Sequence, residues 1–403
     1  MDALSGGGGG GEGLAVMDDH SGRSTASPPP PPLTLPLPHD DLLLEILLRL
    51  PPEPIYLLRA SLVSKHWRRL VHDARFLRRF RAFHGAPPVL GFLNNQSGPS
   101  LFVPTSDAFA AVPSSTMSHD SWWALDCRHG LALLQNRNSG NLLVWHLMSG
   151  EQRCLPRPPP ALDEYDCGLG FNAAVLRAAG NEDRLDCRSC PFLVAMALTH
   201  GVDAGLTSAC VYSSETSVWG DVISVATAED VEARPTALVG NTLYSQMTGG
   251  YILEFDLDNY SLHENEVPND MFCYFEGVLM TAEDGGLGFA VVDDAGLHLH
   301  LFSMVATIGG TLVWALRRAI DLNKFFAPDV AVRCKTVPVE AIGFAEDADV
   351  VFIYVYDCVY MLHLKSMQFD EVSEKGTYNS IFPYTSFYTP ALPCLLSSRN
   401  DEM

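Results

Sequence analysis

Apolar residues recur at helical spacing between Pro38 and His84. One group occupies positions i, i+3, i+4 and i+7, which together form one face of a helix. Its members are Leu43, Ile46, Leu47 and Leu50. Asp40 or Asp41 is placed to cap the first turn of this helix, where a carboxylate also suits the helix dipole. The helix should end at Pro51–Pro52, because proline lacks the N–H that a helix interior needs.

Three further short helices follow from the same pattern. Pro54 can open the second helix in its first turn, and the third begins near Ser64 or Lys65. A fourth amphipathic segment runs over 74–84. The side chains expected to point inward are Ile55, Leu58 and Leu62, then Trp67, Leu70 and Val71, then Phe76, Leu77, Phe80 and Phe83. Short helices joined by short loops predict a compact helical domain over residues 36–84.

After Pro87 the period changes to that of strands, with short apolar runs divided by Gly, Asn and Asp. The clearest runs are Leu142–Trp145, Phe192–Met196, Tyr251–Phe255, Leu297–Leu301 and Val350–Tyr356. Apolar segments of similar shape start near 142, 210, 251, 297 and 360, a spacing that overlaps the period of propeller blades. About six or seven four-stranded blades are expected. A long β-sandwich array is the alternative, but a closed ring removes exposed sheet edges and is therefore favoured.

The predicted fold class is thus α+β and multidomain, with the helical domain followed by an all-β, β-propeller-like domain over residues 87–395. Residues 1–34 contain a glycine run and a proline run and little apolar surface to bury, so we expect a disordered tail there. A short second tail is expected over residues 396–403.

The composition is globular, with 47% hydrophobic and 18% charged residues. A formal net charge of -22 disfavours nucleic acid as a partner, because an acidic surface repels phosphates. Basic residues gather between Arg49 and Arg81, which suggests two surfaces with different partners. No secretory signal is visible, and no apolar stretch reaches the roughly 20 residues of a membrane span. Ten scattered cysteines fit free thiols in a reducing compartment, so we expect the cytoplasm, the nucleus or both.

The segment from Leu37 to Phe80 resembles an F-box, the helical module that docks substrate receptors onto cullin-type ubiquitin ligases. The match runs in order through Leu-Pro, an acidic pair, LLLEIL, RLPP and LVSKHWRRL. The surrounding chain is most similar to grass F-box proteins, through RFLRRF at 75–80, PPVLGF at 87–92 and CRHG at 127–130. This resemblance implies a plant F-box protein with a C-terminal F-box-associated β domain.

The resemblance implies a substrate-recognition adaptor of an SCF-type ubiquitin ligase, without catalytic residues. The F-box would bind a Skp-type adaptor and, through it, a cullin, while the β domain would bind an unknown protein target. The implied adaptor contacts are Leu37, Pro38, Leu42, Ile46, Leu47, Leu50, Pro51, Leu58, Val63, Lys65 and Trp67. Two residues depart from the family pattern. His39 separates Pro38 from the acidic pair, which puts the register of Leu37 and Pro38 in question, and Ser64 stands where cysteine is frequent.

The residues themselves also indicate a partner. Apolar side chains cover more than one face of the first helix, and a bundle this small cannot bury them all. They are Leu42, Leu43, Leu44, Ile46, Leu47, Leu48 and Leu50. Either a partner protein covers the surplus, or the β domain of the same chain does.

Other chemistry finds weaker support in the chain. Cys187 and Cys190 form the one close cysteine pair, which could supply half a zinc site with Cys167, His200 or Cys210. No GxSxG, HExxH or P-loop motif occurs, and the glycine-rich segment 285–288 is expected to be a turn between strands. We expect no cofactor and no metal. The alternatives are a propeller-type hydrolase or glycan-binding protein, and an F-box protein that acts outside the ligase.

Overall fold

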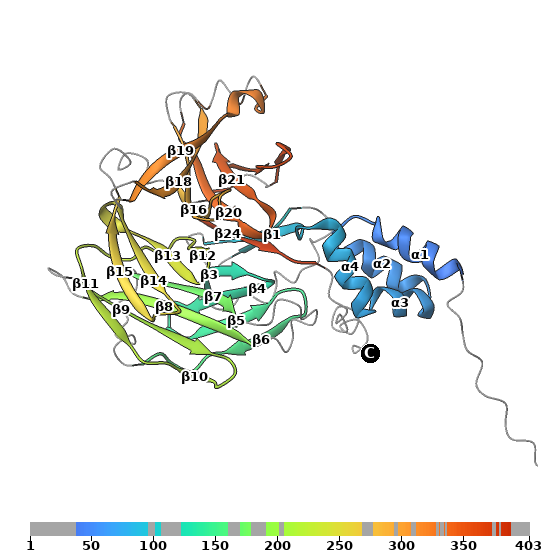
Figure 1. Cartoon of the computed structure of the whole chain (residues 1–403), viewed down its shortest axis with the longest axis horizontal. Coiled ribbons are helices and arrows are strands. Elements are labelled where there is room, and N and C mark those ends of the chain that lie inside the picture. The colour runs from blue at the N-terminus through green and yellow to red at the C-terminus, as the bar shows by residue number, and fades with distance from the viewer. Residues whose placement is uncertain are drawn as a thin grey trace, which may run out of the picture. The chain divides into compact units, whose positions relative to one another are not determined.

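The computed structural model describes residues 38–95, 101–105, 122–159, 170–178, 191–200, 205–267, 277–293, 297–307, 312–327, 330, 334, 337–372, 376–378 and 380–387. The four expected helices are confirmed (Figure 1). They are α1 (Pro38–Leu48), α2 (Pro54–Val63), α3 (Lys65–Val71) and α4 (Ala74–His84). No helix within these ranges is both long and apolar enough to cross a membrane.

The starts of the helices follow from local sequence, with one correction. Because α1 already begins at Pro38, Asp40 and Asp41 lie in its first turn and not at its cap. Pro54 opens α2 as expected. The hydroxyl of Ser64 caps α3 by accepting a hydrogen bond from the Trp67 N–H at 3.1 Å.

Asp73 caps α4, since its carboxylate accepts hydrogen bonds from the N–H groups of Arg75 at 2.8 Å and Phe76 at 3.1 Å. Replacing Asp73 by Ala is expected to lower the free energy of unfolding by about 1 kcal/mol, the usual cost of removing an N-cap. Asp73→Asn keeps an acceptor and should cost only a fraction of that. Chemical unfolding of the full chain measures both variants, and equal losses would show that the cap does not stabilise α4.

The helical domain buries one side of each helix. Leu47, Leu57, Val71, Phe76, Leu77 and Phe80 form its interior. Glu45 pairs with Arg79 at 2.9 Å, and a ring nitrogen of His84 lies 3.1 Å from the Leu48 carbonyl oxygen, so the C-terminal half of α1 is tied to α4. Leu62 and Phe83, which were expected inside, are exposed.

The described strands form six antiparallel sheets, numbered here as blades 1 to 6 (Figure 1). Blade 1 consists of β3 (Trp122–Arg128), β4 (Leu131–Asn136), β5 (Leu142–His146) and β6 (Glu151–Cys154). Blade 2 consists of β7 (Phe171–Arg177), β8 (Phe192–His200), β9 (Gly205–Ser213), β10 (Val218–Trp219) and β11 (Ile223–Thr227), the last two both pairing with β9. Blade 3 consists of β12 (Ala237–Val239), β13 (Thr242–Met247), β14 (Tyr251–Asp256) and β15 (Ser261–Glu266).

The remaining three blades complete the ring. Blade 4 consists of β16 (Val278–Thr281), β17 (Leu287–Val292), β18 (His298–Ala306) and β19 (Leu312–Asp321). Blade 5 consists of β20 (Val339–Ala345), β21 (Val350–Val355), β22 (Cys358–His363) and β23 (Phe369–Glu371). Blade 6 consists of β24 (Ile381–Thr385), β1 (Val89–Asn94) and β2 (Leu101–Pro104). Short 3-10 turns occur at η4 (Thr248–Gly250), η6 (Leu322–Lys324) and η7 (Glu346–Ala348).

Blade 6 closes the ring because its strands come from both ends of the propeller. β1 pairs antiparallel with β24, with Phe92 opposite Pro383. The inner strand β24 also contacts β20 on one side and β3 on the other, while β3 contacts β7, β12 contacts β16, and β16 contacts β20. Between blades 2 and 3, Asn172 donates to the carbonyl oxygens of Glu232 and Arg234. The fold is therefore a six-bladed propeller, which confirms the favoured prediction, and the alternative of a sandwich array is wrong.

The repeat read from the sequence has a simple structural origin. The five apolar segments that start near 142, 210, 251, 297 and 360 correspond to β5, β9, β14, β18 and β22. Each of these is the third strand of its blade, flanked on both sides by other strands. This position needs apolar side chains on both faces, since a blade packs against a neighbour on each side.

The core of the propeller lies between blades. Each pair of adjacent blades shares one apolar cluster. Leu299 of blade 4 and Val351 of blade 5, for example, are fully buried in the same cluster. Such layers hold the blades side by side and leave the ends of the inner strands around the axis.

Candidate functional site

The structure exposes part of the predicted adaptor surface. Leu42, Ile46 and Val63 are apolar side chains that lie largely in solvent, with Ile46 61% and Val63 62% exposed. Pro51 and Lys65 are also exposed. Since Leu42 and Ile46 are one helical turn apart, they lie on the same face of α1.

The other predicted contacts are less accessible. Leu50, Leu58 and Trp67 are half-buried. Leu47 is fully buried, so its side chain stabilises the helical domain instead of facing solvent. Leu37 lies outside the described residues, and Pro38 opens α1 without a described side chain.

Two exposed apolar residues of α2 escaped the prediction. Leu62 is 57% exposed and Tyr56 is 38% exposed. The buried face of α2 is made instead by Pro54, Leu57, Ala60 and Ser61. The sequence did contain a signal for the buried face of α2, namely the small residues Ala60 and Ser61. Small residues in a helix mark the side that approaches a neighbour closely. Leu62 and Val63 therefore form an exposed apolar end to α2.

The helical domain is basic although the chain is acidic. Residues 44–84 contain nine Lys and Arg against three Asp and Glu, a formal net charge of +6. Arg59, Arg69, Arg75 and Arg78 are exposed, like Lys65. An acidic partner surface would therefore be attracted to these helices.

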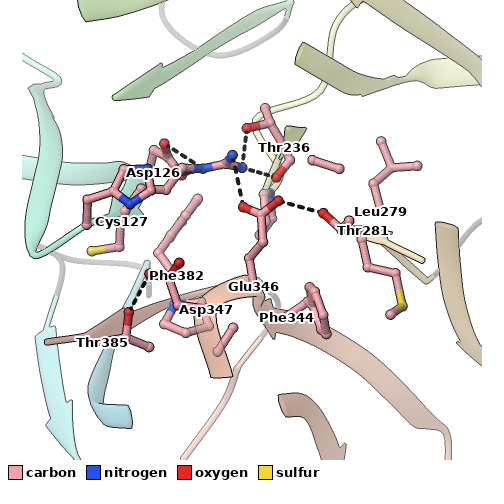
Figure 2. Close-up of a pocket in the computed structure, with 17 residues that line it drawn as sticks. Asp126, Cys127, Thr236, Leu279, Thr281, Phe344, Glu346, Asp347, Phe382 and Thr385 are labelled. Atoms are coloured by element: carbon pink, nitrogen blue, oxygen red, sulfur yellow. Dashed lines mark hydrogen bonds and ion pairs between the residues drawn. The ribbon is translucent and has the colours of Figure 1, made fainter. Parts of the chain in front are cut away.

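A second candidate site is a polar junction at the axis of the propeller (Figure 2), centred on Arg128 at the end of β3. Its side chain is 9% exposed. Its Nε lies 3.2 Å from Asp126, its Nη1 donates to Glu346 at 3.3 Å, and its Nη2 donates to the hydroxyl of Thr236 at 3.0 Å and to the Thr236 carbonyl oxygen. The guanidinium thereby joins blade 1 to the segment before β12 and to the turn after β20.

The partners of Arg128 extend this junction to the remaining blades. Asp126 accepts a hydrogen bond from the Val175 N–H of blade 2 at 2.9 Å. Glu346 accepts from the Thr281 hydroxyl of blade 4 at 2.6 Å. Its neighbour Asp347 accepts from the Thr385 hydroxyl of blade 6 at 3.2 Å. Two consecutive acidic residues of blade 5 thus complete a set of contacts in which every blade takes part.

The electrostatics of the junction are those of a buried ion pair. Burial raises the pKa of Asp126, while Arg128 and the Val175 N–H oppose that rise. Burial alone would lower the pKa of Arg128, but Asp126 and Glu346 outweigh it and leave that pKa raised. The guanidinium is therefore charged throughout the range in which proteins are studied.

Burial also shifts the pKa values of Cys127 and His129, two further groups of the pocket. Burial raises the pKa of the Cys127 thiol well above its ordinary value, and Asp126 adds to the rise. Burial lowers the pKa of His129, although Asp347 opposes it. A protonated thiol is a poor nucleophile. The free volume at the centre is about 30 Å³, which has room for about one water and not for a substrate.

The candidate zinc ligands that lie within the described residues do not come together into a metal site. Cys167, Cys187 and Cys190 lie outside the described residues. Cys210 is buried opposite Met196, four residues from the position of His200 along β8. Burial raises the pKa of Cys210 to about 12. No group of three His, Cys, Asp or Glu within the described ranges is placed to hold a metal ion.

The helical domain and the six-bladed propeller together define a class, the F-box proteins that carry a propeller. An F-box domain model matches residues 37–79. A family model described as "F-box protein AT5G49610-like, beta-propeller" matches residues 123–392, more than half of the chain. The chain therefore belongs to this family.

Individual relatives agree with the family. The chain is 22% identical to F-box protein At5g03970 of Arabidopsis thaliana, and the match covers 90% of each chain. Among solved structures it is similar to an aldose sugar dehydrogenase of Streptomyces coelicolor, with 12% identity and a TM-score of 0.34 over 71% of this chain and 86% of that one. It is also similar to BamB of Moraxella catarrhalis, with 12% identity and a TM-score of 0.30 over 72% and 88%. These two structural scores are too low to inform function.

Proposed function

We propose that this protein is the substrate receptor of an SCF-type ubiquitin ligase, and that it works by holding a target and not by catalysis. The observation that carries the proposal is the set of exposed apolar residues on α1 and α2, in a domain that matches an F-box. Leu42, Ile46, Leu62 and Val63 leave apolar surface in solvent that a partner would bury. A Skp-type adaptor would cover it and connect the chain to a cullin.

In this proposal the propeller binds the protein target and acts as a rigid holder. The Arg128 junction supports this role, because its ion pairs and hydrogen bonds join all six blades. A tethered target lysine then meets the ubiquitin-loaded enzyme at high effective concentration. The resemblance of 75–80 and 87–92 to grass F-box proteins, together with the free thiols expected of a reducing compartment, supports a plant protein of the cytoplasm or nucleus.

The test is adaptor binding by a surface variant. Ile46→Asp places a charge on an exposed position, so the chain should fold, while its affinity for a co-expressed plant Skp-type adaptor should fall by more than about 30-fold, or about 2 kcal/mol. Size-exclusion chromatography of the co-expressed pair measures this. Leu47→Asp would not serve, because Leu47 is buried and its loss would unfold the domain.

Val218→Asp is the matched control, since Val218 is 58% exposed on β10, far along the chain in blade 2. This variant should keep the adaptor. A stable complex with Ile46→Asp would contradict the proposal. A complex with the adaptor but never with a cullin would favour an F-box protein that acts outside the ligase. If the protein does not bind the adaptor but turns over a substrate or binds a glycan, the hydrolase or glycan-binding alternative is favoured.

A further inference from the structure

The lysines of this chain are few and unevenly placed. There are five of them against 21 arginines, although lysine is normally among the commonest residues. Lys65 lies in the helical domain, and the other four lie at positions 324, 335, 365 and 375. The span 66–323 between them holds sixteen arginines and no lysine. Over most of its length the chain therefore carries its positive charge on guanidinium groups alone.

Side-chain geometry explains only some of these arginines. Arg128 and Arg153 each reach several acceptors, which the five donors of a guanidinium allow and an ammonium matches poorly. Arg59, Arg69 and Arg78 are exposed, and their side chains form no ion pair within the part of the chain that the structure describes. At such positions a lysine would supply the same charge, so the choice of arginine needs another reason.

The two cations differ in a reaction that concerns every subunit of a ubiquitin ligase. Lysine accepts ubiquitin. An unprotonated lysine amine forms an amide bond with the C-terminal carbonyl of ubiquitin, the thioester bond to the carrier enzyme breaks, and the proton of the amine leaves with the released thiol. A receptor tethered in the ligase meets the loaded enzyme at high effective concentration, as its target does. Any lysine of the receptor within reach is therefore a competing acceptor.

The four lysines of the propeller lie along the chain between β19 and β24. Lys324 follows β19, and Lys365 follows β22 of blade 5. Lys335 and Lys375 lie outside the described residues, one before β20 and one after β23 in the sequence. The sequences of blades 6, 1, 2 and 3 contain no lysine. In a ring of six, blade 2 lies opposite blade 5, so the lysine-free arc is centred away from the strands that these four residues flank.

Carboxylates lie beside both described lysines of the propeller. The ammonium of Lys324 is 3.6 Å from the carboxylate of Asp321, and Lys365 pairs with Asp349. The hydrogen bond to Asp349 raises the pKa of Lys365. Because the amine must lose its proton before it attacks a thioester, this pairing lowers the reactive fraction of Lys365. The remaining lysine, Lys65, is exposed on the predicted adaptor surface, where a bound adaptor would cover it.

We propose that this protein is protected from ubiquitination by its own ligase, because the arc of blades 1 to 3 faces the ubiquitin-loaded enzyme and carries arginine in place of lysine. The inference rests on the proposed function and assigns the surface that lies nearest to that enzyme. The bound target then supplies the acceptor lysines, and the receptor remains intact for another round of transfer.

The test follows ubiquitin transfer to the full chain in a ligase reconstituted with adaptor, cullin, activating enzyme and carrier enzyme, without a target. Val218→Lys places an amine on β10 of blade 2, where Val218 is 58% exposed. This variant should be modified about tenfold faster than wild type, since its amine lies within reach of the loaded enzyme. Gel shift measures the rate, and mass spectrometry locates ubiquitin at position 218. Val218→Arg is the matched control, because it adds the same charge without an acceptor amine, and it should be modified at the wild-type rate.

Arg137→Lys extends the test to blade 1 without a change of charge, and it should also accelerate modification. Two results would overturn the inference: lysine variants modified no faster than wild type, or wild-type protein modified at Lys324 or Lys365 as fast as Val218→Lys is at position 218. Size-exclusion chromatography shows whether each chain binds the adaptor and the cullin, and discharge of ubiquitin onto free lysine shows that the ligase is active. If no complex forms, the proposed function fails. If an active complex forms and the rates are equal, this inference alone fails.

Discussion

Replacing Arg128 by Met is expected to lower the free energy of unfolding by about 3–5 kcal/mol, the usual result of removing one partner from a buried ion pair. Methionine fills similar space but leaves the Asp126 carboxylate without its cation. That side chain is 5% exposed, so water cannot replace the guanidinium. Chemical unfolding of the full chain, followed by tryptophan fluorescence, measures the loss.

The charge on Asp126, and not the lost volume, should account for most of this loss. Adding Asp126→Asn to Arg128→Met is therefore expected to recover part of the stability, although Asp126→Asn alone destabilises the wild-type protein. The deficit should also shrink as the pH falls. A carboxyl whose pKa is raised by folding binds protons more tightly when folded, so it stabilises at low pH, and that contribution is lost as the pH rises through the folded pKa.

Arg137→Met provides the comparison for Arg128→Met. Arg137 is exposed and lies over the Trp123 ring at 4.1 Å, a contact worth about 0.5–1 kcal/mol at such a site. If the two arginine variants lose similar stability, the junction at the axis is not a special support of the fold.

Much of the fold could be predicted because its signals are local. The i, i+3, i+4, i+7 pattern of Leu43–Leu50 and the prolines around it place α1 and α2 to within a few residues. The repeat of apolar segments marks the third strand of five blades, since that strand is covered on both faces. Blade 6 escaped the repeat because its strands come from opposite ends of the propeller.

The polar junction could not be assembled from the sequence, because its contacts span long separations. Arg128 meets Thr236 across 108 residues and Glu346 across 218 residues. One local signal did exist: Asp126 and Arg128 are two opposite charges in a strand that is otherwise apolar, and such charges are normally paired when they are buried. The side of α2 that faces solvent was also misjudged, because Leu58 and Leu62 were weighed by hydrophobicity and the small residues Ala60 and Ser61 were not.

Replacing Gly343 by Ala is expected to lower the free energy of unfolding by about 1–3 kcal/mol, the typical cost of overpacking a core. Gly343 lies in β20 at an irregularity of its register with β21. A Cβ atom there would lie 2.6 Å from Cγ1 and 3.0 Å from the carbonyl oxygen of Ile381, which is fully buried in β24. The added methyl group therefore forces blades 5 and 6 apart at the sheet that holds both ends of the propeller.

A double variant separates the two contributions to this strain, the clash with the Ile381 side chain and the clash with its backbone oxygen. Ile381→Ala removes the clashing Cγ1 but not the backbone oxygen, so the combination with Gly343→Ala should cost less than the sum of the two single changes while remaining less stable than wild type. Gly286→Ala is the control, because a Cβ atom there would have its nearest neighbour, a carboxylate oxygen of Asp284, at 3.3 Å. The Gly343→Ala chain should also be cut faster by a protease near blade 6, because closure of the ring depends on the contact between β20 and β24. Unchanged stability and unchanged cleavage would contradict this prediction, because they would show that β20 and β24 can move apart enough to accept the methyl group without cost.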